Sequence, residues 1–322
     1  MTPVAAPVAL RTRKPTGKPP WPIILIAGAE KTGKSYACAA ASASAFIDRT
    51  FWISVGEDDP DELGALPGAR FEIVEHDGTY RGVLGAIDAA AAQPFDPAKP
   101  NMIVLDSATR LWDLIVDDAQ AVANSRRNAK AGEDSPISMD LWNAAKAKWA
   151  NAMTLLRAHR GPSLVTSRYD LVTVIERGKP TMEKEWKIKA EKSLPYDVGA
   201  VVEMPARGEV YLDSVRSLKF TSEPGRRVRY DSFSVENLWR DMGVTEPGAT
   251  SERVHATAVM TNPHAPVLTE IGQLADQLPG GRRAVSEMWA EAHEGQPINQ
   301  ASDLPGLEAL RDSLAKRLAT QS

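Results

Sequence analysis

The first half of the chain alternates short apolar runs with longer segments that lack proline. The apolar runs predict strands over residues 22–27, 50–56, 102–106 and 162–168. Continuous runs of this length are typical of strands that are buried on both faces of a parallel sheet. The segments between them predict helices over residues 34–46, 80–92 and 138–159, with a short strand at 71–74. This alternation predicts an α/β fold with a mostly parallel central sheet.

The longest predicted helix, about residues 138–159, follows a polar loop at 123–137. Its apolar residues recur at intervals of three or four and include Trp142, Ala145, Trp149, Ala152 and Leu156. This spacing is that of a buried helix face. We therefore expect these tryptophans to pack against the sheet and not to stack on DNA.

From Leu171 onward the hydrophobic pattern changes to a period of two. One alternating run, 171–175, leads to a turn at Gly178-Lys179-Pro180, and a second run follows around Trp186. Further short strands are predicted at 198–204, 209–212 and 228–230. Alternating runs joined by tight turns indicate antiparallel strands, so the sheet is expected to continue in antiparallel fashion.

Shifts in composition divide the chain into four regions. Residues 1–20 are rich in proline, alanine and basic residues and predict a flexible basic arm. The core is expected at 21–243, and a linker rich in Thr, Pro, Ala and Gly at 244–266. Residues 267–322 contain three helical patterns, at 268–278, 284–293 and 307–319, and predict a small helical C-terminal module.

Composition narrows the classes of function. Cys38 is the only cysteine, which excludes an internal disulfide and a cysteine-based zinc site. The net charge of −4 implies that any nucleic-acid contact must come from local basic patches. No run is long and apolar enough for a membrane span, and the N-terminus has no signal-peptide core. We therefore expect a cytoplasmic protein with no membrane partner.

Residues 28–35, Gly-Ala-Glu-Lys-Thr-Gly-Lys-Ser, fit the phosphate-binding P-loop pattern G-x-x-x-x-G-K-[ST] between a predicted strand and a predicted helix. Backbone N–H groups and the helix N-terminus then face an anion. Lys34 is expected to reach the β- and γ-phosphates, and Ser35 to ligate Mg²⁺. The sequence thus predicts ATP and Mg²⁺ as ligands. The predicted nucleotide-binding residues are Gly28, Ala29, Glu30, Lys31, Thr32, Gly33, Lys34, Ser35 and Tyr36.

Two further carboxylates are expected beside the P-loop. Asp106 ends a predicted strand, and the carboxyl ends of parallel strands line the ligand crevice, so we assign it the metal-orienting role called Walker B. The next residue is Ser107, so the group that orients the attacking water must come from elsewhere. Glu57, at the end of the second strand, is the candidate, with Asp58 and Asp59 as rivals.

The order of Lys34, Glu57 and Asp106-Ser107 resembles the RecA family core. More narrowly, the chain resembles the phage-encoded RecA-like ATPases that accompany single-strand annealing and recombination, which would place it in the cytosol of a bacterial host. The shared features are Leu111-Trp112 after Walker B, the Trp-rich helix, the strand end Thr166-Ser167-Arg168, and Tyr196-Asp197-Val198. The resemblance covers about residues 20–235 and implies a RecA-like P-loop NTPase core.

The resemblance also implies roles for residues outside the P-loop. The strand that ends at Ser167 or Arg168 would carry the sensor residue. The family usually has a polar amide there, and this chain departs from it, so Arg168 is expected either to contact the γ-phosphate directly or to pair with an acid such as Glu57. Lys189 and Lys192 would reach a neighbouring subunit's nucleotide, or else lie outward on an edge strand. The resemblance also implies DNA-binding residues in two places. They are Arg126, Arg127 and Lys130 in the polar loop at 123–137, and Arg177 and Lys179 at the turn around 178–180.

One departure bears on function. A compact Gly178-Lys179-Pro180 turn replaces the long glycine-rich second loop of strand-exchange proteins, which favours single-strand binding or annealing over strand invasion. The resemblance implies an ATPase that acts on single-stranded DNA, assembles into a ring or filament, and works with a single-strand binding or annealing protein. The alternatives are a ring-shaped helicase or loader and a nucleotide-gated assembly protein. A small-molecule kinase is disfavoured, because an acceptor-binding lid has no clear counterpart.

Overall fold

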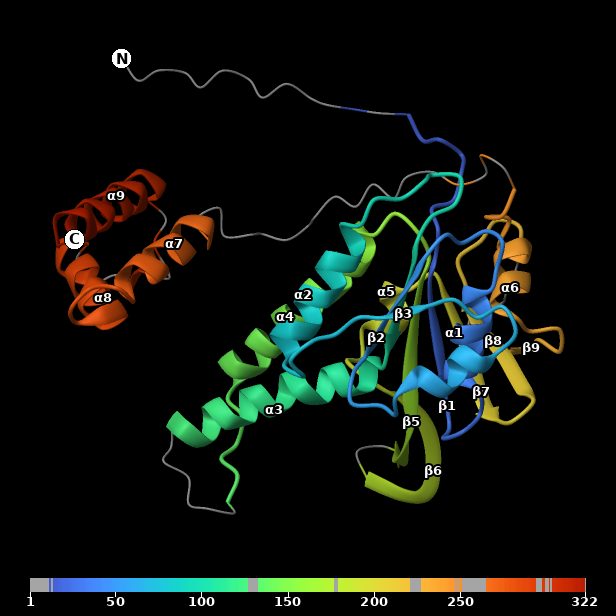
Figure 1. Cartoon of the computed structure of the whole chain (residues 1–322). Helices are drawn as coiled ribbons and strands as arrows, with labels where there is room; N and C mark the ends of the chain where they lie inside the picture. Colours follow the sequence, from blue (N-terminus) through green and yellow to red (C-terminus); the bar gives the residue numbers. More distant parts are fainter. Residues whose placement is uncertain are drawn as a thin grey trace. The chain divides into compact units, whose positions relative to one another are not determined.

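The computed structural model describes residues 12, 14–126, 133–176, 179–220, 227–246, 248, 250, 265–293, 297–298, 301 and 303–321. These residues belong to two compact units, within 1–255 and 256–322 (Figure 1). The predicted basic arm at 1–20 is described only at residue 12 and from residue 14 onward. Most of the predicted linker, at 247, 249 and 251–264, lies outside the described residues.

The first unit is built on a sheet of nine strands among the described residues (Figure 1). The strands are β1 (Ile23–Gly28), β2 (Thr50–Ser54), β3 (Glu72–Ile73), β4 (Met102–Asp106), β5 (Ser163–Glu176), β6 (Lys179–Lys189), β7 (Ala200–Ala206), β8 (Glu209–Val215) and β9 (Val228–Arg229). Their order is β3-β2-β4-β5-β1-β7-β8-β9, with β6 paired to β5. Pairs from β3 to β7 are parallel, and those of β8, β9 and β6 are antiparallel. The predicted α/β class, with its parallel centre and antiparallel extension, is confirmed.

Helices cover both faces of the sheet and bury separate apolar clusters. One cluster joins alternate strand residues such as Leu25, Ile53 and Leu105 to α2 (Tyr80–Ala91), α3 (Ala108–Arg126) and α4 (Met139–Ala158). The other joins the intervening residues, such as Ile24, Trp52 and Val104, to α1 (Lys34–Ser42), the 3₁₀ helix η1 (Pro60–Ala65) and α6 (Val235–Met242). A short helix, α5 (Leu194–Asp197), follows β6. Because side chains alternate along a strand, each central strand contributes to both clusters.

The predicted stripe on the long helix is largely confirmed. Ala145, Trp149, Ala152 and Leu156 are buried in the cluster beneath α2 to α4. Trp142 is only half-buried. The stripe therefore serves packing, and Trp149 meets Trp112 of α3 edge to face at a centroid distance of 5.9 Å.

Several predicted boundaries were wrong. Helix α1 ends at Ser42 and not at residue 46, because the Arg70 guanidinium binds the carbonyl oxygens of Ser42, Ser44 and Ile47 and so stabilises an early exit from the helix. The runs 162–168 and 171–175 form one strand, β5, because β6 pairs with it across the polar break.

Helices α3 and α6 were not predicted, and a strand ends earlier than expected. Helix α3 runs to Arg126 and takes the first four residues of the predicted polar loop. Helix α6 begins at a Ser234 cap and ends at Gly243, whose φ of 74° suits glycine. Strand β6 ends at Lys189, so Lys192 lies after the strand in a turn before α5, where the chain leaves the ladder.

The second unit consists of α7 (Ala265–Ala275), α8 (Gly281–Ala292) and α9 (Leu304–Gln321). The helices bury their own cluster, which includes Ile271, Trp289, Leu307 and Leu314. Among the described residues of the whole chain, no helix combines the length and apolar character that crossing a membrane would require.

Candidate active site

The P-loop connects the buried strand β1 to helix α1. Gly33 precedes the helix with a φ of 104°, a value that disfavours any residue with a side chain, and Lys31 has a φ of 58°. A Cβ atom at Gly28 would lie 2.3 Å from the carbonyl oxygen of Met204 on β7. Glycine is thus required at 28 for the close approach of β7. All nine residues predicted to bind nucleotide, 28–36, lie together in this loop and the first turn of α1.

Lys34 lies folded over the loop. Its Nζ atom donates hydrogen bonds to the carbonyl oxygens of Ala29, at 2.6 Å, and Gly28, at 3.2 Å. Burial lowers the pKa of Lys34, although the nearby carboxylates of Asp106 and Glu57 oppose that shift. The ammonium group therefore sits where a phosphate in the loop would meet it, and an anion would replace the carbonyl oxygens as its partner.

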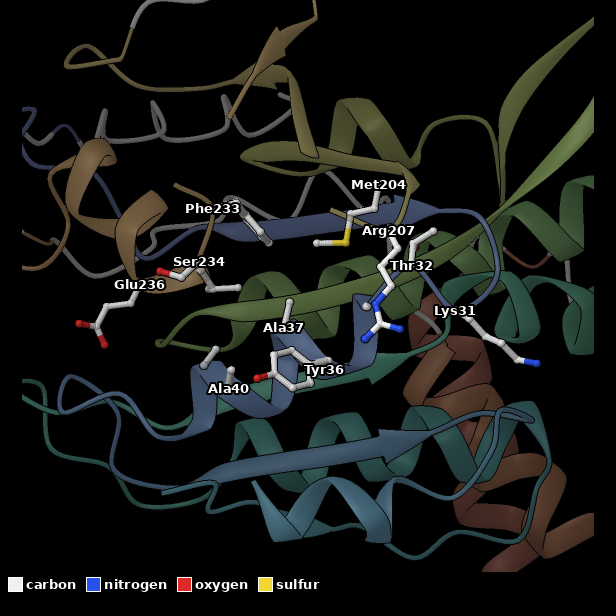
Figure 2. A pocket seen from close by; sticks show the side chains of 13 residues that line it. Lys31, Thr32, Tyr36, Ala37, Ala40, Met204, Arg207, Phe233, Ser234 and Glu236 are labelled. Carbon is white, nitrogen blue, oxygen red and sulfur yellow. The ribbon is translucent and has the colours of Figure 1, made fainter. Parts of the chain in front are cut away.

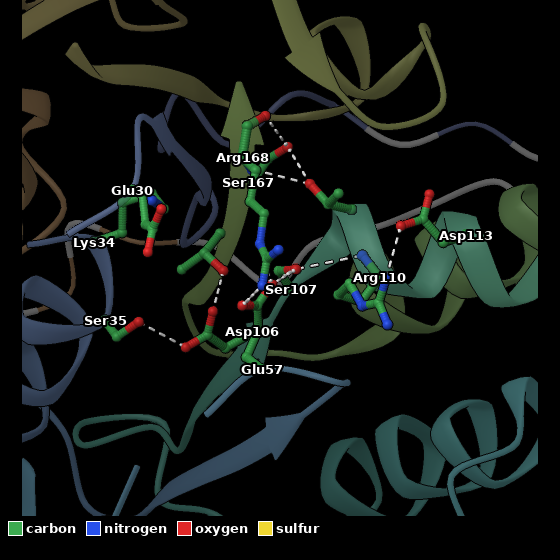
Figure 3. Close-up of polar contacts among 12 residues, drawn as sticks. Glu30, Lys34, Ser35, Glu57, Asp106, Ser107, Arg110, Asp113, Ser167 and Arg168 are labelled. Carbon is green, nitrogen blue, oxygen red and sulfur yellow. Dashed lines mark hydrogen bonds and ion pairs between the residues drawn. The ribbon is translucent and has the colours of Figure 1, made fainter. Parts of the chain in front are cut away.

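Asp106 is held between two hydroxyl groups at the end of β4. Ser35 Oγ donates to Asp106 Oδ2 at 2.8 Å, and the Thr166 hydroxyl donates to Oδ1 (Figure 3). The side chain is 5% exposed, and burial raises its pKa while these two hydrogen bonds oppose the rise. The predicted metal residues, Ser35 and Asp106, are therefore in direct contact.

This pair fits Mg²⁺. Mg²⁺ is usually bound through one or two carboxylates together with substrate phosphates and water, not through an all-protein cage. Among the described residues, no group of three or more His, Cys, Asp or Glu side chains forms such a cage. Ser35 and Asp106 would hold the ion directly or through water, and the ion would neutralise charge on the phosphates.

Glu57 is the acid that the fold directs toward this site. It follows β2, whose continuation is fixed by the Val55 N–H donating to the Asp106 carbonyl at 2.5 Å. Ser107 Oγ donates to Glu57 Oε1 at 2.5 Å. Of the rivals, Asp58 is exposed, and Asp59 caps η1 by accepting from the Asp61 N–H. The geometry therefore favours Glu57 among the three candidates.

Arg168 lies opposite Glu57, at the point where β5 passes the P-loop strand. Its Nε donates to Glu57 Oε1 at 3.0 Å, and a second guanidinium nitrogen binds Oε2 (Figure 3). This bidentate ion pair raises the pKa of Arg168. The sequence left two partners open for Arg168, the γ-phosphate and an acid such as Glu57. The structure shows the pairing with Glu57.

A buried hydroxyl fixes the position of Arg168. Thr109, at the start of α3, accepts from the Arg168 N–H at 2.9 Å and donates to the Lys189 carbonyl at 2.5 Å. Its Oγ1 also lies 3.0 Å from Ser167 Oγ. Ser167, the other sensor candidate, is thereby buried in this contact, while Arg168 reaches the site. No local pattern in the sequence marks Thr109, because its partners lie 58 to 80 residues away.

A pocket of about 500 Å³ opens beside the P-loop, on the α6 side of α1 (Figure 2). Tyr36, 56% exposed, lies on one side, and Arg207, from the turn between β7 and β8, points toward it. Met204 and Phe233 provide apolar walls. Arg207 forms no ion pair with any residue that the structure describes. An aromatic ring and a guanidinium group suit the two faces of a planar base, so this pocket fits the nucleobase side of a nucleotide.

The other predicted residues lie outside this cluster. Lys189 Nζ is 3.6 Å from Asp113 Oδ2 of its own chain, and Lys192 is exposed. Arg126 lies in the last turn of α3, not in a loop, and pairs with Asp140 at 2.6 Å. Lys179 begins β6. Arg127, Lys130 and Arg177 lie outside the described residues.

A P-loop lysine, a serine in contact with a buried strand-end aspartate, and a glutamate on the adjacent strand define a P-loop nucleoside triphosphatase. The sequence profile of a family described as an AAA domain matches residues 22–230, and the chain belongs to this family. The protein is therefore an AAA-type ATPase. Membership implies ATP as the nucleotide, usually with Mg²⁺.

Comparisons with curated proteins and with solved structures do not narrow the function further. No curated protein matches the chain. One similar solved structure is described as a prototypical ATPase from the type III secretion system of pathogenic bacteria. It is 14% identical, with a TM-score of 0.37, over 92% of this chain and 81% of that chain. A similarity this distant says nothing about the function of this chain.

Proposed function

We propose that this AAA-type ATPase is of the phage-encoded RecA-like type and acts on single-stranded DNA in recombination, annealing or replication. The observation that carries the proposal is the continuity of β5. This strand contributes Thr166 and Arg168 to the nucleotide site and then runs on into a two-stranded projection with β6. A polymer bound along the projection would therefore change the position of Arg168, which binds Glu57.

The chemistry of the site is ATP hydrolysis by positioning and charge stabilisation. Glu57 orients the attacking water, and Lys34 stabilises charge on the phosphates. When bound, Mg²⁺ neutralises negative charge as the terminal phosphate departs. Arg168 holds Glu57 in place before substrate arrives, and the γ-phosphate offers the guanidinium group an alternative anionic partner.

The case for DNA rests on the projection and on the resemblance to the RecA core. Strand β6 presents exposed lysines at 184, 187 and 189. Proteins that bind single strands combine such cationic surfaces with groups on which bases stack. Self-association into a ring or filament fits the same proposal, because one subunit would then complete the nucleotide site of the next.

The decisive measurement is the ATPase rate with and without single-stranded DNA. We expect a severalfold stimulation by an unstructured oligonucleotide and a smaller one by duplex of equal length. The Lys34→Ala protein is the control for contaminating ATPases. An unchanged rate, combined with an oligomeric state that responds to ATP, would contradict the proposal and indicate a nucleotide-gated assembly protein. Electron microscopy of the ATP-bound form separates a ring-shaped helicase or loader from a filament.

A further inference from the structure

The β5–β6 projection, here called the arm and distinct from the N-terminal basic segment, comprises the described residues 169–176 and 179–188. Strand β5 pairs with β1 only as far as Arg168 and with β4 only as far as Val165. From Tyr169 onward its described pairing is with β6 alone. Side chains on both faces of the arm are exposed, including Asp170 and Leu171 on β5 and most of β6. The arm therefore stands out from the sheet as a two-stranded ribbon (Figure 1).

One face of the arm carries an exposed tryptophan. All eight tryptophans lie in the described part of the chain, and Trp186, at 52%, is the one whose side chain is exposed. It lies opposite Leu171, itself 43% exposed. Its ring stacks on that of Tyr169, with centroids 6.1 Å apart and planes 30° apart. Tyr169 in turn packs against the buried cluster of the sheet, so the exposed ring rests on a fixed support.

A lysine lies beside this ring. Lys184 is two residues before Trp186 on β6 and pairs with Thr173. Residues two apart on a strand point to the same face, so Lys184 and Trp186 share one surface. Lys187 is paired with Glu185, at 2.7 Å, and Lys189 with Asp113, at 3.6 Å. Lys184, by contrast, forms no ion pair with any described residue.

We propose that this face of the arm, formed by Leu171, Trp186 and Lys184, is a stacking site for single-stranded nucleic acid. A base lies on the open face of Trp186, and Lys184 contacts an adjacent phosphate. This inference rests on the proposed function and adds an aromatic side chain and a lysine to the DNA-binding residues that the resemblance implies. A duplex fits poorly, because its bases are already stacked within the helix.

The size of the patch distinguishes this ligand from a protein partner. Stable protein interfaces bury about 800 Å² on each side, over 20 residues or more. The exposed apolar side chains whose strand pairing places them on this face are Leu171 and Trp186, next to a lysine and a threonine, which matches one base and its phosphate. Aromatic residues that stack on bases do so regardless of sequence, since every base has a π-face. The site therefore predicts binding without strong sequence preference.

The test is equilibrium binding of a fluorescein-labelled oligo(dT) by anisotropy, in the full chain with ATP. We expect Trp186→Ala to weaken binding by about 10- to 100-fold, as for the loss of one base–aromatic stack, without changing the salt slope. Lys184→Ala should lower the salt slope by about 0.7, the value for one phosphate contact of a single strand. Val172→Ala, an apolar truncation next to Leu171 on the opposite face of the arm, is the matched control and should bind as the wild type does.

A second readout does not depend on the alanine variant folding. Binding of oligo(dT) should quench tryptophan fluorescence of the wild type, and Trp186→Phe should bind while losing most of that quenching. The basal ATPase rate should be unchanged in all these variants, because none of the changed residues contacts the nucleotide site.

The outcomes separate the two proposals. If the wild type binds no single-stranded DNA, the proposed function fails. If the wild type binds but Trp186→Ala and Lys184→Ala bind equally well, with quenching intact in Trp186→Phe, DNA binds elsewhere and this inference is overturned. If Trp186→Ala instead dissociates an oligomer and leaves DNA affinity unchanged, the face is an interface between copies, which also overturns it.

Discussion

The two halves of β5 form one strand but differ in burial and in pairing. Residues 163–167 are all buried; β1 pairs with each of them, and β4 pairs with 163–165. Residues 169–176 pair with β6 alone, and none of the side chains described there, 169–173, is fully buried. Arg168 stands at the border, with its N–H on Thr109 and its guanidinium group on Glu57.

The comparison shows how one element combines rigidity with accessibility. The sheet half places the Thr166 hydroxyl on Asp106, a contact that tolerates little displacement because packed interiors deform little. The arm half is free to meet a ligand. The same covalent strand joins both, so a force on the arm reaches Arg168 without an intervening hinge residue. The following experiments test whether ATP hydrolysis and the response to a bound ligand depend on residues on opposite sides of Arg168.

The largest effect is expected on the sheet side, at the P-loop. Lys34→Ala removes the charge that faces the phosphates and should reduce ATP hydrolysis below detection, while thermal unfolding stays close to that of the wild type. Lys146→Ala is the matched control, since it removes an exposed lysine of α4 that is not part of the site. Wild-type turnover by the Lys34 variant would refute the P-loop assignment.

The next largest effect is expected at Glu57. Glu57→Gln keeps the size of the side chain but removes the charge that orients water, so turnover should fall by about 100-fold or more with ATP binding retained. Single-turnover hydrolysis and nucleotide titration measure the two separately. Asp58→Asn and Asp59→Asn serve as controls. If either control is inactive while Glu57→Gln turns over normally, the catalytic acid is misassigned.

A smaller effect is expected at the border residue. Arg168→Ala leaves Glu57 held by Ser107 alone, so kcat should fall by about tenfold, while ATP affinity changes less than twofold. The split between kcat and affinity identifies positioning, because a general loss of structure would lower both. A rise in the basal rate would instead show that the ion pair restrains Glu57 and that the arm acts by releasing it.

The smallest effect concerns lysines near the base of the arm. If Lys189 and Lys192 complete a neighbour's site, mixing Lys189→Ala/Lys192→Ala subunits with Lys34→Ala subunits should restore part of the activity. Some junctions would then join an intact P-loop to an intact pair of lysines. The ATPase rate per subunit of the wild type should also rise with protein concentration. A concentration-independent rate and an inactive mixture would leave Lys189 with its contact to Asp113 in the same chain.

The parts of the site that the sequence predicts are those with local patterns. The P-loop is a continuous motif, and Asp106 and Glu57 each follow an apolar run, so the topology of parallel strands suffices to bring them to one edge. The direction of Glu57 could not be predicted, because it depends on Ser107 and Arg168, which are 50 and 111 residues away.

Other features of the structure were not predicted from the sequence, for different reasons. Four buried residues of α3, Leu111, Ile115, Ala119 and Ala123, recur every four positions, so a local helix pattern was present there although the helix was not predicted. The alternating pattern of the arm predicts its two antiparallel strands but not that they project from the sheet, because no local pattern marks where the pairing of β5 with β1 and β4 ends. Arg207 enters the pocket only because β7 lies next to β1, a pairing that no local pattern encodes.

The pairing of the arm also restricts how its length can change over evolution. Inserting one residue between Arg168 and Leu171 would move Leu171 to the opposite face, and Trp186 would lose its neighbour. Inserting two residues into each strand would lengthen the ribbon and restore every face. The nucleotide site would be unaffected, since the register of β5 is set before this point by Gly28 and Thr109. Relatives of this chain should therefore tolerate even changes in strand length and reject odd ones.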